Sequence, residues 1–426
     1  MPLTRTNEQA TGISGTKGLN ALTALIGFFL WTPALGLPVG PMWLQPVDIL
    51  IVLGYPTILA FLPQLPKKTA LVILLSAASA FCAALNGGDF FILVYYLGFV
   101  TPFLLFIGVV ASRPDTRKTF ITFFALGGAT SLALFTGQLV VGAENLDFRT
   151  NMTFGLPQQY KRGFGLFPEV STFSTHLIYL LGVIIVFLRA QTVRRLFPFG
   201  RVSVLAVLVI ICLLFTRSTS ILVVAPAIVA VAYFKGRTLS LKGVVGAILV
   251  VAITTILLQV YIEVFYSERA SAGGHRSIWL RGISILAGLS VLPNGEIFGV
   301  GLGNNHMITE RAIETARTLG FSLILIPEGI NSFVVTRIFE EGWSVVLPFG
   351  VAFSYLVVTC TVYQRDVYAR AFVVLAVASA MVSLSVTGYR GIYMNWFWLA
   401  AASALMNQSK PQTQPISLKR FASYKT

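Results

Sequence analysis

The sequence predicts an all-α, polytopic membrane protein with about twelve transmembrane helices, and three observations support this prediction. The 426-residue chain has a mean hydropathy of +0.80, and 56% of its residues are hydrophobic whereas only 11% are charged. Many apolar runs reach about 18 residues, the length that a helix needs to cross a bilayer. The runs also lack the alternating polarity of barrel strands. Because backbone polar groups must be paired inside lipid, we expect helices.

Short loops separate most of the predicted spans, which fall at roughly 19–37, 43–63, 69–85, 89–111, 118–142, 170–188, 201–216, 218–234, 243–266, 341–363, 370–387 and 391–407. The first run is long for a signal-peptide core and has no small-residue cleavage site, so we expect it to be retained. The predicted layout is a polar tail (1–18), five helices (19–142), a loop (143–169), four helices (170–266), a large loop (267–340), three helices (341–407) and a basic tail (408–426).

The distribution of Lys and Arg predicts that both termini are cytoplasmic. With the N-terminus inside, most of the 31 basic residues fall in segments on the cytoplasmic side. Both long loops are then extracytoplasmic, and their cations, like those of the short outer loops, are arginines except for Lys161. Arginine has a planar fork that suits two-pronged binding of phosphate or carboxylate. Long extracytoplasmic loops are also exempt from the rule that keeps positive charges on the cytoplasmic side. The alternative interpretation is therefore that any single arginine in these loops has no functional role.

Composition and spacing argue against several other classes of site. The three cysteines, Cys82, Cys212 and Cys360, lie in apolar runs, so we expect small buried side chains rather than disulfides. The net charge of +15 fits basic cytoplasmic loops, and no basic run with interleaved aromatic residues predicts nucleic-acid binding. No cluster of His, Cys, Asp or Glu has metal-ligand spacing, so we expect neither a metal nor another cofactor.

The end of the first long loop carries the densest group of charged and conformationally special residues. Arg162 stands beside two glycines, which let a backbone approach a ligand closely. Pro168 suits the first turn of a helix, and Glu169 follows it there. Two interpretations of Glu169 stay open: an acid matched to the helix dipole, or a base or orienting partner for Arg162.

Two further polar residues lie near the predicted outer surface. His176 is two helical turns after Glu169 and on the same face. An ionisable group inside a membrane is a functional candidate, and a hydrogen-bonded packing histidine is the alternative. Arg217 lies in a tight outer hairpin, where it either belongs to a site or extends its charge toward the membrane surface.

The second long loop contains a predicted surface helix at 276–290. Arg276 lies on its apolar face, where a cation needs an anionic partner such as a phosphate, whereas Arg281 faces water. Gly299, Gly301 and Gly303 follow. Their spacing does not match a nucleotide-binding loop, so we expect a tight turn with close backbone packing.

Three stretches resemble parts of a known family. They are the stretch from Arg162 to Ser171, with Val170 where proline is usual; Arg276 and Trp279 followed by Phe298–Gly303; and Asn331-Ser332-Phe333 followed by Glu341-Gly342. Together with the topology, they resemble the bacterial O-antigen polymerases (Wzy-type) and O-antigen ligases, which are polysaccharide glycosyltransferases with a GT-C-like architecture. The ligases carry histidine where this chain has Ile330, so the resemblance favours a polymerase.

The resemblance implies which residues form the site. Arg162, Arg217 and Arg276 match arginines that bind the diphosphate of a polyprenyl-linked sugar in the family. In such a transfer the leaving group already carries its charge, so catalysis requires charge stabilisation and removal of a hydroxyl proton. Arg162 and Arg276 are therefore expected to be catalytic, with Glu169 as base or orienting group. The remaining candidates for substrate binding are Arg217, Arg281, Arg337, Asn331 and His176.

The expected function is polymerisation of polyprenyl-diphosphate-linked repeat units into O-antigen or exopolysaccharide at the outer face of the bacterial inner membrane. The resemblance suggests a flippase and a chain-length regulator as partners, besides membrane lipids. Two alternatives stay open: a ligase that transfers the glycan to a lipid or protein acceptor, and a transporter or flippase for lipid-linked sugars. A transporter places charged groups near the membrane midplane, and here the only plausible acids for that role are Asp48 and Glu263.

Overall fold

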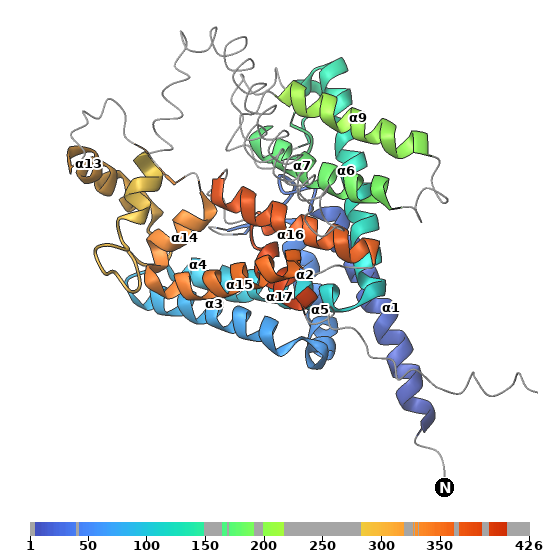
Figure 1. Cartoon of the computed structure of the whole chain (residues 1–426), viewed down its shortest axis with the longest axis horizontal. Coiled ribbons are helices and arrows are strands. Elements are labelled where there is room, and N and C mark those ends of the chain that lie inside the picture. The colour runs from blue at the N-terminus through green and yellow to red at the C-terminus, as the bar shows by residue number, and fades with distance from the viewer. Residues whose placement is uncertain are drawn as a thin grey trace, which may run out of the picture.

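Most of the described chain is helical (Figure 1). The computed structural model describes residues 5–39, 42–148, 164–167, 170–190, 199–216, 283–318, 327, 329–330, 332–361, 366–385 and 392–406. Within these residues the only strands are β1 (Leu37–Val39) and β2 (Met42–Leu44), a short antiparallel pair. The predicted helical class is confirmed for this part of the chain.

The helices are mostly joined by short connections. The α-helices are α1 (Arg5–Phe29), α2 (Pro46–Phe61), α3 (Lys67–Leu85), α4 (Phe90–Tyr95), α5 (Thr101–Ser112), α6 (Pro114–Val141), α7 (Val170–Arg189), α9 (Phe199–Thr216), α13 (Ile308–Thr318), α14 (Phe333–Glu341), α15 (Trp343–Thr361), α16 (Val367–Ser385) and α17 (Phe397–Met406). Short 3-10 turns are η1 (Leu62–Gln64), η3 (Ala143–Leu146), η5 (Asn305–Met307) and η6 (Tyr393–Asn395), and a π-helical segment, η2 (Tyr96–Val100), joins α4 to α5.

Six helices in the described part are long and apolar enough to cross a membrane. They are Pro46–Gln64, Lys67–Leu85, Phe90–Ser112, Pro114–Val141, Thr172–Arg189 and Trp343–Cys360. Shorter apolar helices lie at Val204–Thr216, Val367–Ser383 and Phe397–Met406. Each of these helices overlaps a span predicted from the sequence. The total of about twelve stays a prediction, because 218–234 and 243–266 lie outside the described residues.

The boundaries of the first predicted span, 19–37, are wrong. Helix α1 already begins at Arg5, within the predicted polar tail, and it ends at Phe29. The chain then turns and enters β1 at Leu37. Pro33 accounts for the early end, because proline has no backbone donor and disfavours a helical conformation in the residue before it.

Helix α17 lies inside the bundle, and its residues from Phe397 to Leu405 are all buried. It packs against α3, α5, α15 and α16. Small residues such as Ala401 and Ser403 let neighbouring backbones approach closely, as in packed membrane helices. In contrast, α2 and α3 expose leucines on their outer faces, with Leu53 73% and Leu74 66% exposed. An apolar exterior around an apolar interior is typical of helices surrounded by lipid.

Hydrogen bonds between distant segments show which helix ends lie together. At the start of the span Phe90–Ser112, the Asp89 N–H donates to the carbonyl of Leu302 at 2.6 Å. Beyond the other end of this span, Arg117 at the start of α6 pairs with Asp366 at the start of α16. The first contact joins two segments predicted to be outside, and the second joins two predicted to be inside. The side of the membrane that each end faces stays a prediction.

A second, smaller core lies where α13, α14 and the helical segment 283–289 meet, at the left of Figure 1. Its buried members are Ile283, Ala287, Val291, Ile308, Ala312, Ala316, Ile330, Val335 and Phe339. Of the apolar face predicted for the helix at 276–290, Ile283 and Ala287 are buried, whereas Leu286 is 52% exposed. Phe333 and Val334 of α14 belong to the main core. Helix α14 therefore connects the large loop with the bundle.

Candidate functional site

A buried ion pair lies on α14. The Arg337 side chain is 1% exposed and pairs with the carboxylate of Glu341, which is one helical turn later and fully buried. Residues four apart on a helix share one face, so the sequence itself brings these two charges together. Ser332 caps the start of α14, since its hydroxyl accepts a hydrogen bond from the Val335 N–H, and Gly342 follows the last residue of the helix.

Hydroxyl groups of neighbouring helices complete the surroundings of Glu341. The Ser79 hydroxyl of α3 donates to Glu341 Oε2 at 2.6 Å, and Ser79 Oγ lies 2.7 Å from Ser344 Oγ at the start of α15. Burial raises the pKa of the Glu341 carboxyl, while the charge of Arg337 and the hydrogen bond from Ser79 act in the opposite direction.

Two aromatic rings enclose the guanidinium of Arg337. Its Cζ atom lies 5.0 Å from the ring centroid of Tyr96 and 5.1 Å from that of Trp396, distances at which a cation interacts with an aromatic face. Tyr96 begins the π-helical segment η2, and its hydroxyl oxygen lies 2.6 Å from Ser76 Oγ. Such segments often occur at functional sites, because the extra residue turns a side chain to a new direction.

The glycine-rich loop of residues 296–304 covers the end of α14. The N–H groups of Val300 and Gly301 donate to the carbonyls of Phe339 and Glu340, both at 3.0 Å. These contacts satisfy carbonyls that the last turn of a helix leaves without helical partners. The loop also reaches α3, since the Leu302 N–H donates to the Ala83 carbonyl at 3.2 Å. The motif segments 298–303 and 341–342 thus form one structural unit.

Close backbone packing explains the glycines, as predicted for this loop. Gly299, Gly301 and Gly303 have φ values of +60°, +95° and +93°. A Cβ atom on Gly342, whose φ is +61°, would collide with the carbonyl oxygen of Glu296. These positions therefore require glycine for both conformation and space.

Replacing Gly342 with alanine is expected to destabilise the protein by about 1–3 kcal/mol, because the new Cβ atom meets backbone rather than a flexible side chain. Thermal unfolding of the full-length protein in detergent would measure this change. Alanine at Gly350, where a Cβ atom has open space, is the matched control. Equal unfolding temperatures for the two variants would contradict the close docking of the loop.

The structure describes only part of the predicted site. Arg337 is described, but it is buried in the ion pair with Glu341, and its expected role in substrate binding stays a prediction. The other residues are His176, described below, and six that lie outside the described residues: Arg162, Glu169, Arg217, Arg276, Arg281 and Asn331. Among the described residues, no group of three His, Cys, Asp or Glu side chains is placed to hold a metal ion.

His176 lies in an aromatic cage inside the bundle. Its ring centroid is 4.5 Å from that of Phe167, 5.6 Å from Trp31 and 5.3 Å from Tyr179. Its Nδ1 atom lies 3.0 Å from the carbonyl oxygen of Thr172, one turn earlier on α7. These neighbours are those expected of a hydrogen-bonded packing histidine. They are different residues from those that surround Arg337. The predicted role in substrate binding stays untested.

The described part of the first motif, residues 164–167, is anchored by Gln138 of α6. The N–H groups of Phe164 and Gly165 donate to Gln138 Oε1 at 2.9 and 2.8 Å, and Gln138 Nε2 donates to the Gly165 carbonyl at 3.1 Å. Gln138 is not among the residues predicted from the sequence. A buried amide inside an otherwise apolar helix is the signal that would have identified it, because such a group needs hydrogen-bond partners.

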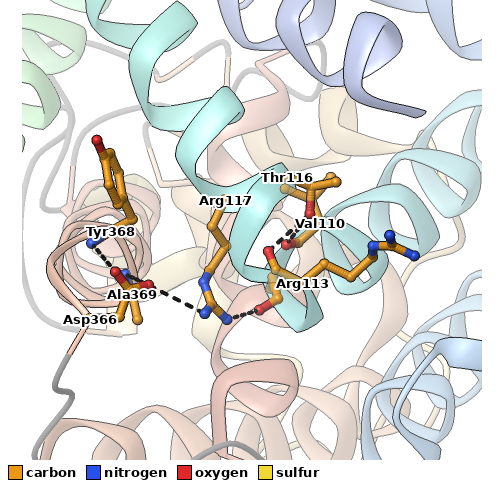
Figure 2. Close-up of polar contacts among 8 residues, drawn as sticks. Val110, Arg113, Thr116, Arg117, Asp366, Tyr368 and Ala369 are labelled. Atoms are coloured by element: carbon orange, nitrogen blue, oxygen red, sulfur yellow. Dashed lines mark hydrogen bonds and ion pairs between the residues drawn. The ribbon is translucent and has the colours of Figure 1, made fainter. Parts of the chain in front are cut away.

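A second ion pair lies at the opposite end of the span Phe90–Ser112. Figure 2 shows the Arg117 guanidinium between the start of α16 and the end of α5. It lies 3.3 Å from Asp366 Oδ2 and donates to the Ala111 carbonyl at 2.7 Å. Asp366 also accepts hydrogen bonds from the N–H groups of Tyr368 and Ala369, which caps α16. This pair holds three helices together.

Comparisons with known proteins do not assign the chain to a family. No protein-family model matches the sequence, and a search of curated proteins found no significant match.

Proposed function

We propose that this protein polymerises polyprenyl-diphosphate-linked oligosaccharide repeat units at the outer face of a bacterial inner membrane. The observation that supports this most is the docking of one motif segment, Phe298–Gly303, on the end of α14. Val300 and Gly301 of this segment donate hydrogen bonds to Phe339 and Glu340, which directly precede the second motif segment, Glu341-Gly342. The segments are distant in sequence, and both belong to the resemblance with O-antigen polymerases. The arginines of the outer loops, above all Arg162 and Arg276, supply the expected contacts with diphosphate.

The proposed reaction transfers a glycan from one lipid carrier to a sugar hydroxyl on another. The bond between the anomeric carbon and the diphosphate oxygen breaks, a bond from the acceptor oxygen forms, and polyprenyl diphosphate leaves. Arginine forks stabilise the charge of the leaving group, and the acceptor proton passes to a base, for which Glu169 is the candidate. The outer arginines and one carboxylate are the parts that this chemistry requires of the protein.

A deletion strain separates the proposed polymerase from the ligase. If the protein is a polymerase, the strain loses long polysaccharide but still attaches single repeat units to the acceptor. If the strain instead keeps long polymer that stays unattached, the protein is a ligase. Electrophoresis of the surface polysaccharide reads both outcomes, and a plasmid copy of the wild-type gene is the control.

A transporter for lipid-linked sugars is a weaker proposal, because Asp48, the described acid that best suits a transport site, does not lie near the middle of a span. Asp48 lies in the first turn of α2. Its Oδ2 atom accepts a hydrogen bond from the Gln45 N–H at 2.6 Å, and its Oδ1 atom accepts one from the Tyr393 hydroxyl. These contacts make Asp48 the buried acidic member of a capping box, in which Gln45 is the N-cap of α2. Glu263 lies outside the described residues.

Polymerisation by the purified protein is expected to continue when divalent cations are removed with EDTA. The leaving diphosphate carries its own charge and meets arginines, so the proposed chemistry needs no bound metal. The measurement is chain growth from lipid-linked repeat units before and after chelation. A loss of more than about tenfold that magnesium reverses would contradict this part of the proposal.

A further inference from the structure

The Arg337–Glu341 ion pair lies directly beneath the glycine-rich loop. Backbone groups on both sides of Glu341 are bound to this loop: the Glu340 carbonyl accepts from Gly301, and the Trp343 N–H donates to the Glu296 carbonyl at 3.2 Å. The position of the loop is therefore tied to the last turn of α14, the turn that the ion pair holds.

Helix α14 has a second connection to the large loop. Val335 and Phe339 belong to the same smaller core as Ile283 and Ala287. Those two residues belong to the predicted helix 276–290, which carries Arg276 of the proposed site. Helix α14 is thus connected both to the glycine-rich loop 296–304 and to the helical segment 283–289. Its residues Arg337 and Glu341 contact the bundle.

Stability alone does not account for this ion pair. Removing two charges from water is costly, and apolar residues of similar volume often replace a buried ion pair without loss of stability. The pair also combines two features that fix its geometry: the ring faces of Tyr96 and Trp396, and the hydrogen bond from Ser79. The π-helical segment that begins at Tyr96 is an independent sign of a specialised site.

We propose that Arg337 and Glu341 are positioning residues that fix the large outer loop against the bundle and thereby set its affinity for a polyprenyl diphosphate. The inference rests on the proposed function, because it assumes that the outer loop binds this lipid. The pair acts through the backbone of residues 296–304 and through the smaller core. Replacing it by apolar residues leaves a folded protein in which the loop is held less firmly.

Undecaprenyl diphosphate is the probe for this proposal. It is titrated onto the full-length protein in detergent, and the change in tryptophan fluorescence gives the dissociation constant. The double variant R337M/E341L removes both charges together and so avoids leaving one buried charge without its partner. We expect its dissociation constant to rise about fivefold or more, the usual lower range for coupling between distinct sites. The KM for lipid-linked substrate should rise by a similar factor, with a smaller change in kcat.

The Arg117–Asp366 pair supplies the matched control. The variant R117M/D366N also removes an ion pair, in which Arg117 is buried and Asp366 is 38% exposed, but at the far end of a span of 23 residues. It should bind the probe like the wild type even if it unfolds at a lower temperature. Gly299→Ala disturbs the loop without changing any charge, and it should weaken binding as R337M/E341L does.

The outcomes separate the inference from the proposed function. If the wild type binds undecaprenyl diphosphate, and R337M/E341L and Gly299→Ala bind it equally well, the inference is overturned and the proposed function stands. If the control variant weakens binding as much as R337M/E341L, the effect follows general stability and the inference is again overturned. If the wild type binds undecaprenyl diphosphate no better than undecaprenol, the proposed function fails and the inference with it.

Discussion

Replacing Arg276 with alanine is expected to reduce chain growth by about 100-fold or more, the usual effect of removing one preorganised group that stabilises charge in a transition state. Arg276 lies on the apolar face of its predicted helix, where a cation needs an anionic partner. The measurement is the length distribution of surface polysaccharide in a deletion strain that carries the variant at the wild-type protein level.

Two variants test whether the loss reflects this particular arginine. Arg276→Lys keeps the charge but loses the planar fork, so we expect it to recover only part of the activity. Arg317→Ala removes an exposed cation on α13 of the same large loop and should leave chain length unchanged. Long polymer from the Arg276→Ala strain at the wild-type level would show that the assignment of Arg276 is wrong.

Replacing Arg337 alone with methionine is expected to lower the free energy of unfolding by about 3–5 kcal/mol, because it leaves the Glu341 carboxylate buried without its counter-ion. The side chains of both residues are almost completely buried, so water cannot compensate for the lost charge. Unfolding of the purified protein by heat or by a denaturing detergent measures the difference from the wild type.

The double variant R337M/E341L should recover most of that stability, since the two charges of the pair are removed together. The comparison forms a mutant cycle in which the two substitutions are strongly non-additive. Independent, additive effects of the single substitutions would contradict the ion pair seen on α14.

The helical fold could be predicted from the sequence because length and hydropathy define helices in lipid almost alone. The prediction was less accurate where local chemistry decides a boundary. Pro33 ends α1 early, although the apolar composition continues beyond it. The glycine-rich loop was correctly interpreted as a tight turn, because glycines at this density indicate unusual φ values.

The candidate site was harder to predict, because its parts meet only in the folded chain. Spacing places Arg337 and Glu341 on one face of a helix, but nothing in the sequence shows that Ser79 and Tyr96 lie beside them. An amide within α6 indicates that Gln138 needs hydrogen-bond partners, but the sequence does not show that these are Phe164 and Gly165 of the loop that follows. Contacts between distant segments leave no local pattern in the sequence from which they could be predicted.

Polymerisation in vitro is the decisive test of the proposed function. The purified full-length protein is placed in liposomes with lipid-linked repeat units extracted from its own deletion strain, and both chain length and free polyprenyl diphosphate are measured. We expect chains of many repeats and one released polyprenyl diphosphate for each bond formed. Intact lipid-linked repeat units and no released diphosphate, from a protein that is folded in the same liposomes, would contradict it.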